Sequence, residues 1–312
     1  MTSLTWVGGG NNKASNPLDW SPHQAPEPGD FLRVLAIPAS PGPFTMNVGG
    51  NDLTGDPLSI NLFVPSSFTA NLSHKAVMSA FVSPSHATFN LSQDSTLDVS
   101  TSYGTAMVNI SGNDTATISP WRGGAIVNLE DGAKWNGTFS TAAGIVTVEG
   151  GADSAFNNNG TSFEGSSDAA GSSATIGVDV IGSGDFQIAS SSHIEFAKSV
   201  GPNQSISDGG WVQIDQPNQF DASVTLVSSS SVFAPSPAEI DLMGLTTADS
   251  YSYKNDMLNI FSGNKIIDTL RLHDSTQYGF VVEPPETRGT VSIVAIADPT
   301  NPLPSLPIHI DS

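Results

Sequence analysis

Five copies of one short strand follow each other in this sequence: Phe68–Leu72 (FTANL), Ala87–Leu91 (ATFNL), Ala106–Ile110 (AMVNI), Ala125–Leu129 (AIVNL) and Gly144–Val148 (GIVTV). The copies start at residues 68, 87, 106, 125 and 144, a constant step of 19. A fixed period of this length is typical of solenoids, in which each repeat is one circuit of the chain. The spacing is too long for a series of tight hairpins.

The two faces of the repeated strand differ in chemistry. The first, third and fifth positions share one face, and they are apolar or glycine in every copy. We therefore expect this face to point inward, with Leu72, Leu91, Ile110 and Leu129 in one stack. The fourth position carries asparagine in four copies, namely Asn71, Asn90, Asn109 and Asn128. Stacked amides hydrogen-bond along such a column, so we predict a structural ladder there.

Other positions keep the same step. A second apolar column is predicted from Ala80, Val99, Ile118 and Phe156, interrupted at Gly137. Trp135 falls in a neighbouring column and is predicted to lie in the core. On the outward face, Met107, Ile126 and Ile145 predict an exposed apolar row, which another segment or a second subunit would cover. Gly, Pro and Ser precede the strands, as sharp corners require.

We predict an all-β fold, a right-handed parallel β-helix of about 19 residues per coil. An N-terminal cap at 1–43 precedes about nine coils at 44–215, and a C-terminal β-region and cap at 216–298 is followed by an extended tail at 299–312. Residues 157–173 break the period and are rich in Gly and Ser, which predicts a loop insertion. Gly49–Leu53 falls one step before Phe68–Leu72 and is predicted to be a degenerate first copy. It also resembles half of a calcium-binding nonapeptide. Because no second copy of the nonapeptide follows it, we predict that the protein binds no cofactor. Calcium at this segment is the one alternative.

Composition limits the class of partner. The 312 residues include 30 acidic and 10 basic ones, which gives a net charge of −20. Nucleic acid and anionic membrane surfaces are disfavoured, because both are bound through Lys and Arg. The sequence holds no cysteine, which excludes disulfides and thiolate chemistry. No apolar run is long enough to span a membrane, and residues 1–6 lack the features of a signal peptide.

Two regions resemble the opening and closing segments of autotransporter-type passenger domains and related bacterial surface β-helices. The motifs that carry the resemblance are Trp6–Gly9, Asp19–Ser21, Gly29–Asp30, Val200–Ile206, Asp215–Phe220 and Ile240–Leu242. The resemblance implies a capped β-helix displayed outside the cell. The cap would cover the open end of the first coil, which an uncovered solenoid needs. We interpret Trp6 and Trp20 as residues that plug the end of the core, with ligand stacking as the alternative.

Candidate binding residues lie at one coil corner. Trp121 and Arg122 sit at a corner where an aromatic side chain is hard to bury, and Tyr103 precedes them by one coil. We predict a stacking platform there for a polysaccharide or cell-surface glycan, with packing of Trp121 against the turn as the alternative. The sequons that begin at Asn71, Asn90 and Asn109 are interpreted as ladder residues.

The sequence favours no catalytic residue and no metal site. The carboxylate pairs Asp94/Asp98 and Glu130/Asp131 are expected to be solvated surface, and the six histidines show no ligand spacing. We predict a non-enzymatic, exported bacterial solenoid that serves as a surface, biofilm-matrix or adhesion component and can self-associate. The alternatives are a polysaccharide-acting β-helix lyase or hydrolase, and a phage tail-spike-like protein. Compartment is predicted to be extracellular or cell-surface.

Overall fold

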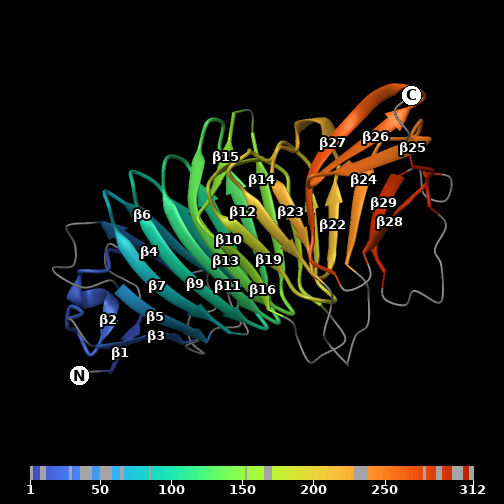
Figure 1. The fold of residues 1–312 in the computed structure, drawn as a ribbon. Helices are drawn as coiled ribbons and strands as arrows, with labels where there is room; N and C mark the ends of the chain where they lie inside the picture. Colours follow the sequence, from blue (N-terminus) through green and yellow to red (C-terminus); the bar gives the residue numbers. More distant parts are fainter. Residues whose placement is uncertain are drawn as a thin grey trace. The chain divides into compact units, whose positions relative to one another are not determined.

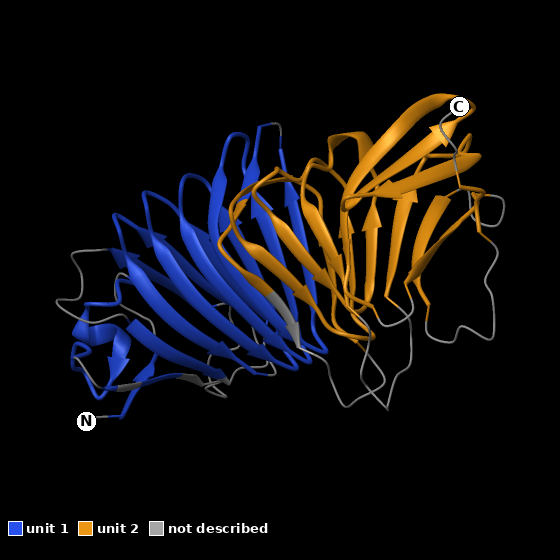
Figure 2. Cartoon of the chain, in the orientation of Figure 1, with its two compact units in different colours: residues 1–156 blue, residues 157–312 orange. Residues whose placement is uncertain are grey.

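The structure is a computed structural model that describes residues 3–7, 12–27, 30–35, 44–49, 58–63, 67–83, 86–151, 153–164, 171–227, 238–276, 279–285, 290–296 and 305–308. The chain divides into two compact units, residues 1–156 and 157–312 (Figure 2). Both are built of strands wound into solenoid turns, about eight in all with roughly 20 residues per turn (Figure 1). The predicted parallel β-solenoid is therefore confirmed, with about one turn fewer than expected. Its handedness stays a prediction.

From residue 31 onward, successive strands of unit 1 alternate between two sheets of parallel strands, so that each turn adds one strand to each; the strands before residue 31 all belong to the first sheet. The odd sheet contains β1 (Ser3–Trp6), β3 (Phe31–Leu35), β5 (Leu58–Phe63), β7 (Val77–Val82), β9 (Thr96–Ser102), β11 (Thr115–Trp121) and β13 (Lys134–Ala142). The even sheet contains β4 (Phe44–Gly49), β6 (Phe68–Ser73), β8 (His86–Leu91), β10 (Thr105–Ile110), β12 (Gly124–Leu129) and β14 (Ile145–Gly150). The short helix η1 (Pro17–Asp19) and strand β2 (Trp20–Ser21) lie near the start, and β15 (Ala155–Asn158) crosses the boundary between the units.

The repeated strands pair in the predicted register over four copies. Leu72 lies opposite Leu91, Leu91 opposite Ile110, and Ile110 opposite Leu129. All four side chains are buried, which confirms the inward stack. Buried residues alternate strictly with more exposed ones along β6, β8, β10 and β12, as expected for strands with one face on the core.

The ends of the repeat differ from the prediction. The copy before Phe68 is Phe44–Val48, which pairs with Phe68–Leu72, so Gly49–Leu53 is not the first copy. The fifth copy is shifted by two residues, because Ala125 lies opposite Val146 and not opposite Gly144. The turn is longer at the corner before β13, and Thr115 consequently pairs with Asn136, 21 residues on.

This insertion also corrects two side-chain columns. Phe139, not Gly137, continues the column of Ile118, so that column is uninterrupted. The outward row is also shorter than predicted: Met107 neighbours Ile126, but the next residue in the row is Thr147. Ile145 instead lies opposite Gly124.

Trp135 lies in the core as predicted, although it does not occupy the column that the 19-residue step assigned to it. Gly137 lies opposite Ala116, and the missing side chain leaves room for the indole. The Trp135 Nε1 donates a hydrogen bond of 2.9 Å to the Ala116 carbonyl oxygen. The ring stacks on Phe156 at a centroid distance of 4.2 Å, which places a large aromatic cluster inside unit 1.

The N-terminal segment belongs to the solenoid and is not only a cap. β1 pairs in parallel with β3, and β3 with β5, so parallel pairing begins inside residues 1–43. Trp6 and Trp20 are fully buried against each other, with ring centroids 5.0 Å apart. Both tryptophans therefore lie in the core of unit 1, where the sequence placed them.

Unit 2 combines parallel turns with an antiparallel end. Its parallel ladders run through β16 (Thr161–Glu164), β19 (Asp185–Ile188), β21 (Ser205–Asp208), β23 (Ser223–Leu226) and β27 (Lys265–Asp274), and through β17 (Ser173–Ile176), β20 (His193–Phe196), β22 (Trp211–Ile214) and β24 (Glu239–Met243). Antiparallel pairs add β25 (Ser250–Lys254) and β26 (Met257–Ser262) to β27, and β28 (Phe280–Glu283) and β29 (Thr290–Ala295) to β24. β18 (Asp179–Gly182) and η2 (Pro217–Gln219) complete the elements.

Two predicted boundaries in unit 2 need correction. Residues 157–173 are not one loop, since β16 occupies residues 161–164; residues 165–170 lie outside the described part. Parallel pairing continues past residue 215, because β24 pairs with β22 and β27 with β23. Most of the predicted tail at 299–312 also lies outside the described residues.

Candidate functional site

An exposed aromatic cluster lies at one corner of unit 1. Tyr103 and Trp121 are 61% and 54% exposed, and their ring centroids are 6.5 Å apart at an interplanar angle of 57°. The Arg122 Nη1 donates a hydrogen bond of 2.9 Å to the Tyr103 hydroxyl. Its guanidinium carbon lies 5.5 Å from the centre of the Trp121 ring, within the range of a cation–π contact. The structure thus brings together all three predicted site residues, named here the aromatic platform.

The backbone explains why these side chains face solvent. Trp121 is the last residue of β11, where every second side chain points outward. Tyr103 and Arg122 adopt left-handed backbone conformations, with φ of 57° and 53°. Such values are uncommon outside Gly, Asn and Asp. The next residue, Gly123, has no room for a side chain, because a Cβ there would lie 2.5 Å from the Thr101 hydroxyl oxygen.

The platform combines apolar ring faces with fixed hydrogen-bonding groups. Two rings one turn apart present flat surfaces, and the cation of Arg122 holds them in a defined arrangement. Exposed aromatic rings that keep a polar end in water suit ligands with both apolar and polar faces. Sugar rings have that character, because their C–H faces are apolar and their rims carry hydroxyls.

The asparagine ladder exists and is longer than predicted. Each amide nitrogen donates to the side-chain oxygen one turn back: Asn71 to Asn47 at 2.8 Å, Asn90 to Asn71 at 2.7 Å, Asn109 to Asn90 at 2.7 Å, and Asn128 to Asn109 at 2.9 Å. All of these contacts are part-buried. Asn47 is thus the first member, and Asn71 is an interior one. Each interior asparagine donates to one neighbour and accepts from the other, as expected for a column that stabilises the fold.

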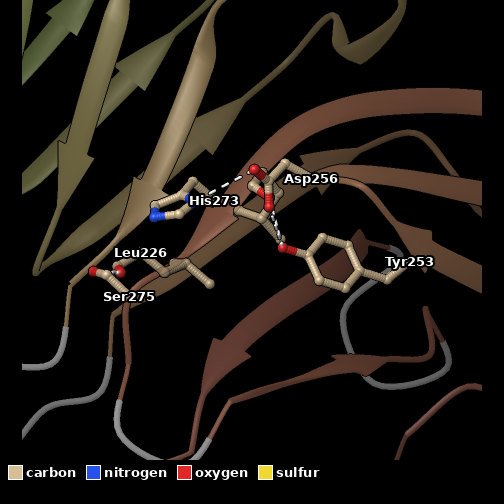
Figure 3. A network of polar contacts seen from close by, with 6 residues as sticks. Leu226, Tyr253, Asp256, His273 and Ser275 are labelled. Atoms are coloured by element: carbon tan, nitrogen blue, oxygen red, sulfur yellow. Dashed lines mark hydrogen bonds and ion pairs between the residues drawn. The ribbon is translucent and has the colours of Figure 1, made fainter.

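Unit 2 contains a polar network around Tyr253 (Figure 3). The Tyr253 hydroxyl lies 2.9 Å from the Leu272 carbonyl and 3.1 Å from Asp256 Oδ1, and His273 Nδ1 lies 3.4 Å from Asp256 Oδ2. Ser275 donates its hydroxyl to the Leu226 carbonyl at 2.6 Å. Nucleophilic catalysis requires the hydroxyl to donate to the base, and here the main chain takes that bond. His273 and Asp256 are also more than 60% exposed, so the network does not form a catalytic triad.

A second polar cluster on β20, β22 and β24 was not predicted. His193 stacks on Trp211 with ring centroids 4.1 Å apart, and Trp211 Nε1 donates to Asp241 Oδ2 at 3.0 Å. Ser292 on β29 donates to the other oxygen of Asp241. Burial lowers the pKa of His193, against the opposing effect of Asp241. The 18-residue step from His193 to Trp211 was the available signal, because it places them opposite each other.

One carboxylate pair lies beside this cluster. Burial raises the pKa of Glu195, and the negative charge of Asp215 raises it further. Two like charges close together disfavour ionisation of both groups, which explains the direction of this pKa shift. The predicted surface pairs Asp94/Asp98 and Glu130/Asp131 are exposed.

Within the described residues no group of three or more His, Asp or Glu side chains could hold a metal ion. The calcium alternative at Gly49–Leu53 falls mainly on residues outside the described part. Among the described residues there is also no helix with the length and hydropathy that crossing a bilayer requires.

No family model, curated protein or solved structure matches this chain.

Proposed function

We propose that this chain is a non-enzymatic solenoid that binds glycan through the aromatic platform of Tyr103, Trp121 and Arg122. The single observation that carries the proposal is the exposure of two aromatic rings one turn apart, held by a hydrogen-bonded arginine. Large aromatic side chains left this exposed on a rigid corner favour a binding role over a packing role. Rigid parallel strands fix the platform before any ligand arrives, which limits the entropic cost of binding.

A binding role also agrees with the contact of Ser275. Its hydroxyl donates to the main-chain carbonyl of Leu226, whereas a catalytic nucleophile donates to its base. Nothing specific in the described residues favours the lyase or hydrolase alternative. The tail-spike alternative rests on a threefold assembly, which size measurements in solution would detect.

We further propose that the protein acts outside the cell, as a surface, biofilm-matrix or adhesion component. The support is the resemblance of its end segments to autotransporter passengers and the low charged fraction of 13%. Self-association remains part of this proposal, although the outward apolar row that suggested it has only two adjoining members, Met107 and Ile126.

The experiment is co-sedimentation of the purified full chain with insoluble polysaccharides. The panel contains cellulose, mannan, xylan and curdlan as neutral polymers, and calcium alginate and calcium pectate as acidic ones. We expect retention on at least one neutral polymer and loss of that retention in Trp121→Ala. The matched control is Trp211→Ala, which removes an exposed tryptophan of unit 2. Equal retention of Trp121→Ala and the parent, or no retention on any polymer, would refute the proposal.

A further inference from the structure

A third exposed aromatic side chain lies on the same sheet as the platform. Phe81 on β7 is 37% exposed and borders a shallow, open groove of about 220 Å³. The other lining residues come from three successive strands, and most are short and polar: Ser59, Ile60, Asn61, Ser79, Ala80, Asp98 and Ser100. The groove therefore presents one apolar ring among hydroxyl, amide and carboxylate groups.

The groove and the platform occupy one face of the odd sheet of unit 1. Phe81 lies opposite Ser100 on β9, and Ser100 lies opposite Ser119 on β11. Trp121 follows Ser119 by two residues on β11, so both side chains point to the same outward face. Two strand spacings and two residues along a strand separate Phe81 from Trp121, which amounts to about 12 Å between their Cα atoms. The outward side chains between Phe81 and Trp121 are those of Ser100 and Ser119, and both carry hydroxyl groups.

The size of the groove indicates a part of a longer ligand. Pockets that enclose a whole small molecule usually measure roughly 300–1,000 Å³, and this groove is smaller and open. It has room for one sugar ring. Successive turns are about 4.8 Å apart, a distance close to the advance of an extended hexose chain per residue. A chain that crosses the strands therefore meets a new row of hydroxyls at each turn.

Charge and strand pairing narrow the chemistry of the ligand. The net charge of −20 and the exposed Asp98 beside Phe81 disfavour a polyanion. An extended peptide would bind by adding to an open strand edge. β7, β9 and β11 each have a parallel neighbour on both sides, so this face offers side chains and no free main-chain groups.

We infer that one extended, uncharged polysaccharide chain lies across β7, β9 and β11, with one sugar against Phe81 and another on the aromatic platform. This inference rests on the proposed function, because it assigns the ligand class and a second subsite to the same face. The hydroxyls of Ser100 and Ser119 and the carboxylate of Asp98 supply hydrogen bonds to the hydroxyls of the intervening sugars.

The test is calorimetric titration of the full chain with a disaccharide-to-octasaccharide series. The series is cut from the neutral polysaccharide that sediments the protein most strongly. A chain that reaches both the aromatic platform and Phe81 gains a second stacking contact, so affinity should rise with length and then level off. Phe81→Ala should leave the disaccharide affinity unchanged and weaken the octasaccharide about three- to tenfold. Trp121→Ala should weaken every length. Val77→Ala, on the same strand and the same outward face, is the matched control and should change neither.

The outcomes separate this inference from the proposed function. If Phe81→Ala binds the octasaccharide as the parent does while Trp121→Ala fails, the second subsite is refuted and the proposed function stands. If Trp121→Ala binds every length normally, both are refuted. If an oligogalacturonate series binds as tightly as the neutral one, the assignment to an uncharged chain is refuted.

Discussion

Replacing Asn109 by alanine tests whether the asparagine ladder stabilises the solenoid. Asn109 donates to Asn90 at 2.7 Å and accepts from Asn128 at 2.9 Å. The substitution therefore removes two side-chain hydrogen bonds and leaves one acceptor and one donor on the neighbours without their partner. A neutral hydrogen bond contributes about 0.5–1.5 kcal/mol, so two of them predict a loss of about 1–3 kcal/mol. Partial burial of the column keeps the loss within this range.

The end of the ladder offers a graded comparison. Asn128 donates to Asn109, and the ladder residue that follows it is replaced by Glu149. Asn128→Ala therefore removes one ladder bond, whereas Asn109→Ala removes two. We expect its cost to be about half as large, or less if the interior bonds strengthen one another. Met107→Ala, on the same outward face as Asn109, controls for general truncation of that face.

The assay is urea unfolding followed by far-ultraviolet circular dichroism, with the midpoint and slope fitted for each variant. The order of stability should be parent and Met107→Ala, then Asn128→Ala, then Asn109→Ala. An Asn109→Ala variant within about 0.5 kcal/mol of the parent would refute the structural interpretation, as that is the scatter of neutral surface substitutions. A normal midpoint with lost polysaccharide retention would instead make the ladder a binding site.

Three further predictions concern single residues. Burial raises the pKa of Asp208 from 3.8 to about 7, so the folded state keeps a proton that the unfolded state releases. The free energy of unfolding should then fall between about pH 4 and pH 7 and level off above pH 7. Measured by urea unfolding, Asp208→Asn should be up to about 4 kcal/mol more stable than the parent at about pH 8 and equally stable at about pH 4. A variant with the same pH profile as the parent would contradict this. Gly137→Ala should lower the free energy of unfolding by about 2–4 kcal/mol, because its Cβ would overlap the Ala116 carbonyl oxygen and lie 2.8 Å from Trp135 Nε1. A variant more stable than the parent, as expected for an ordinary strand glycine, would refute this packing. Tyr103→Gly should be about 1 kcal/mol more stable than Tyr103→Ala, since φ is 57° there, while both lose polysaccharide retention; equal stability would argue against strain at this corner.

Much of the fold followed from the repeat, because stacked turns place equivalent residues in register. The step of 19 predicted the pairing of β6, β8, β10 and β12. It failed at the fifth copy, because the corner before β13 takes two more residues and shifts Val146 opposite Ala125. Corner length is invisible to strand periodicity, since a turn that lengthens outside the sheets leaves the apolar alternation intact. The pairing of Gly137 with Ala116 depends on this longer corner. Only that spatial neighbour and the Trp135 ring show why a glycine is needed there.

The candidate site was predictable in part. Trp121 and Arg122 at a corner, with Tyr103 19 residues before Arg122, predicted a shared surface because corners of successive turns stack. The groove beside Phe81 was not predicted. It depends on how side chains from β5, β7 and β9 leave space between them, which no pattern in one strand records. The His193–Trp211–Asp241 cluster was missed because Ser292 reaches it from an antiparallel strand far along the chain.

The most direct test of glycan binding at the aromatic platform is a ¹H–¹⁵N spectrum of the tryptophan indoles during titration with the neutral octasaccharide. Trp121 is exposed, whereas Trp135 is buried and its Nε1 is bonded to Ala116. The platform predicts that the Trp121 indole resonance, assigned by its absence in Trp121→Phe, moves with added sugar while that of Trp135 stays fixed. Movement confined to Trp211, or a Trp121 signal that stays in place while the sugar binds, would contradict the account.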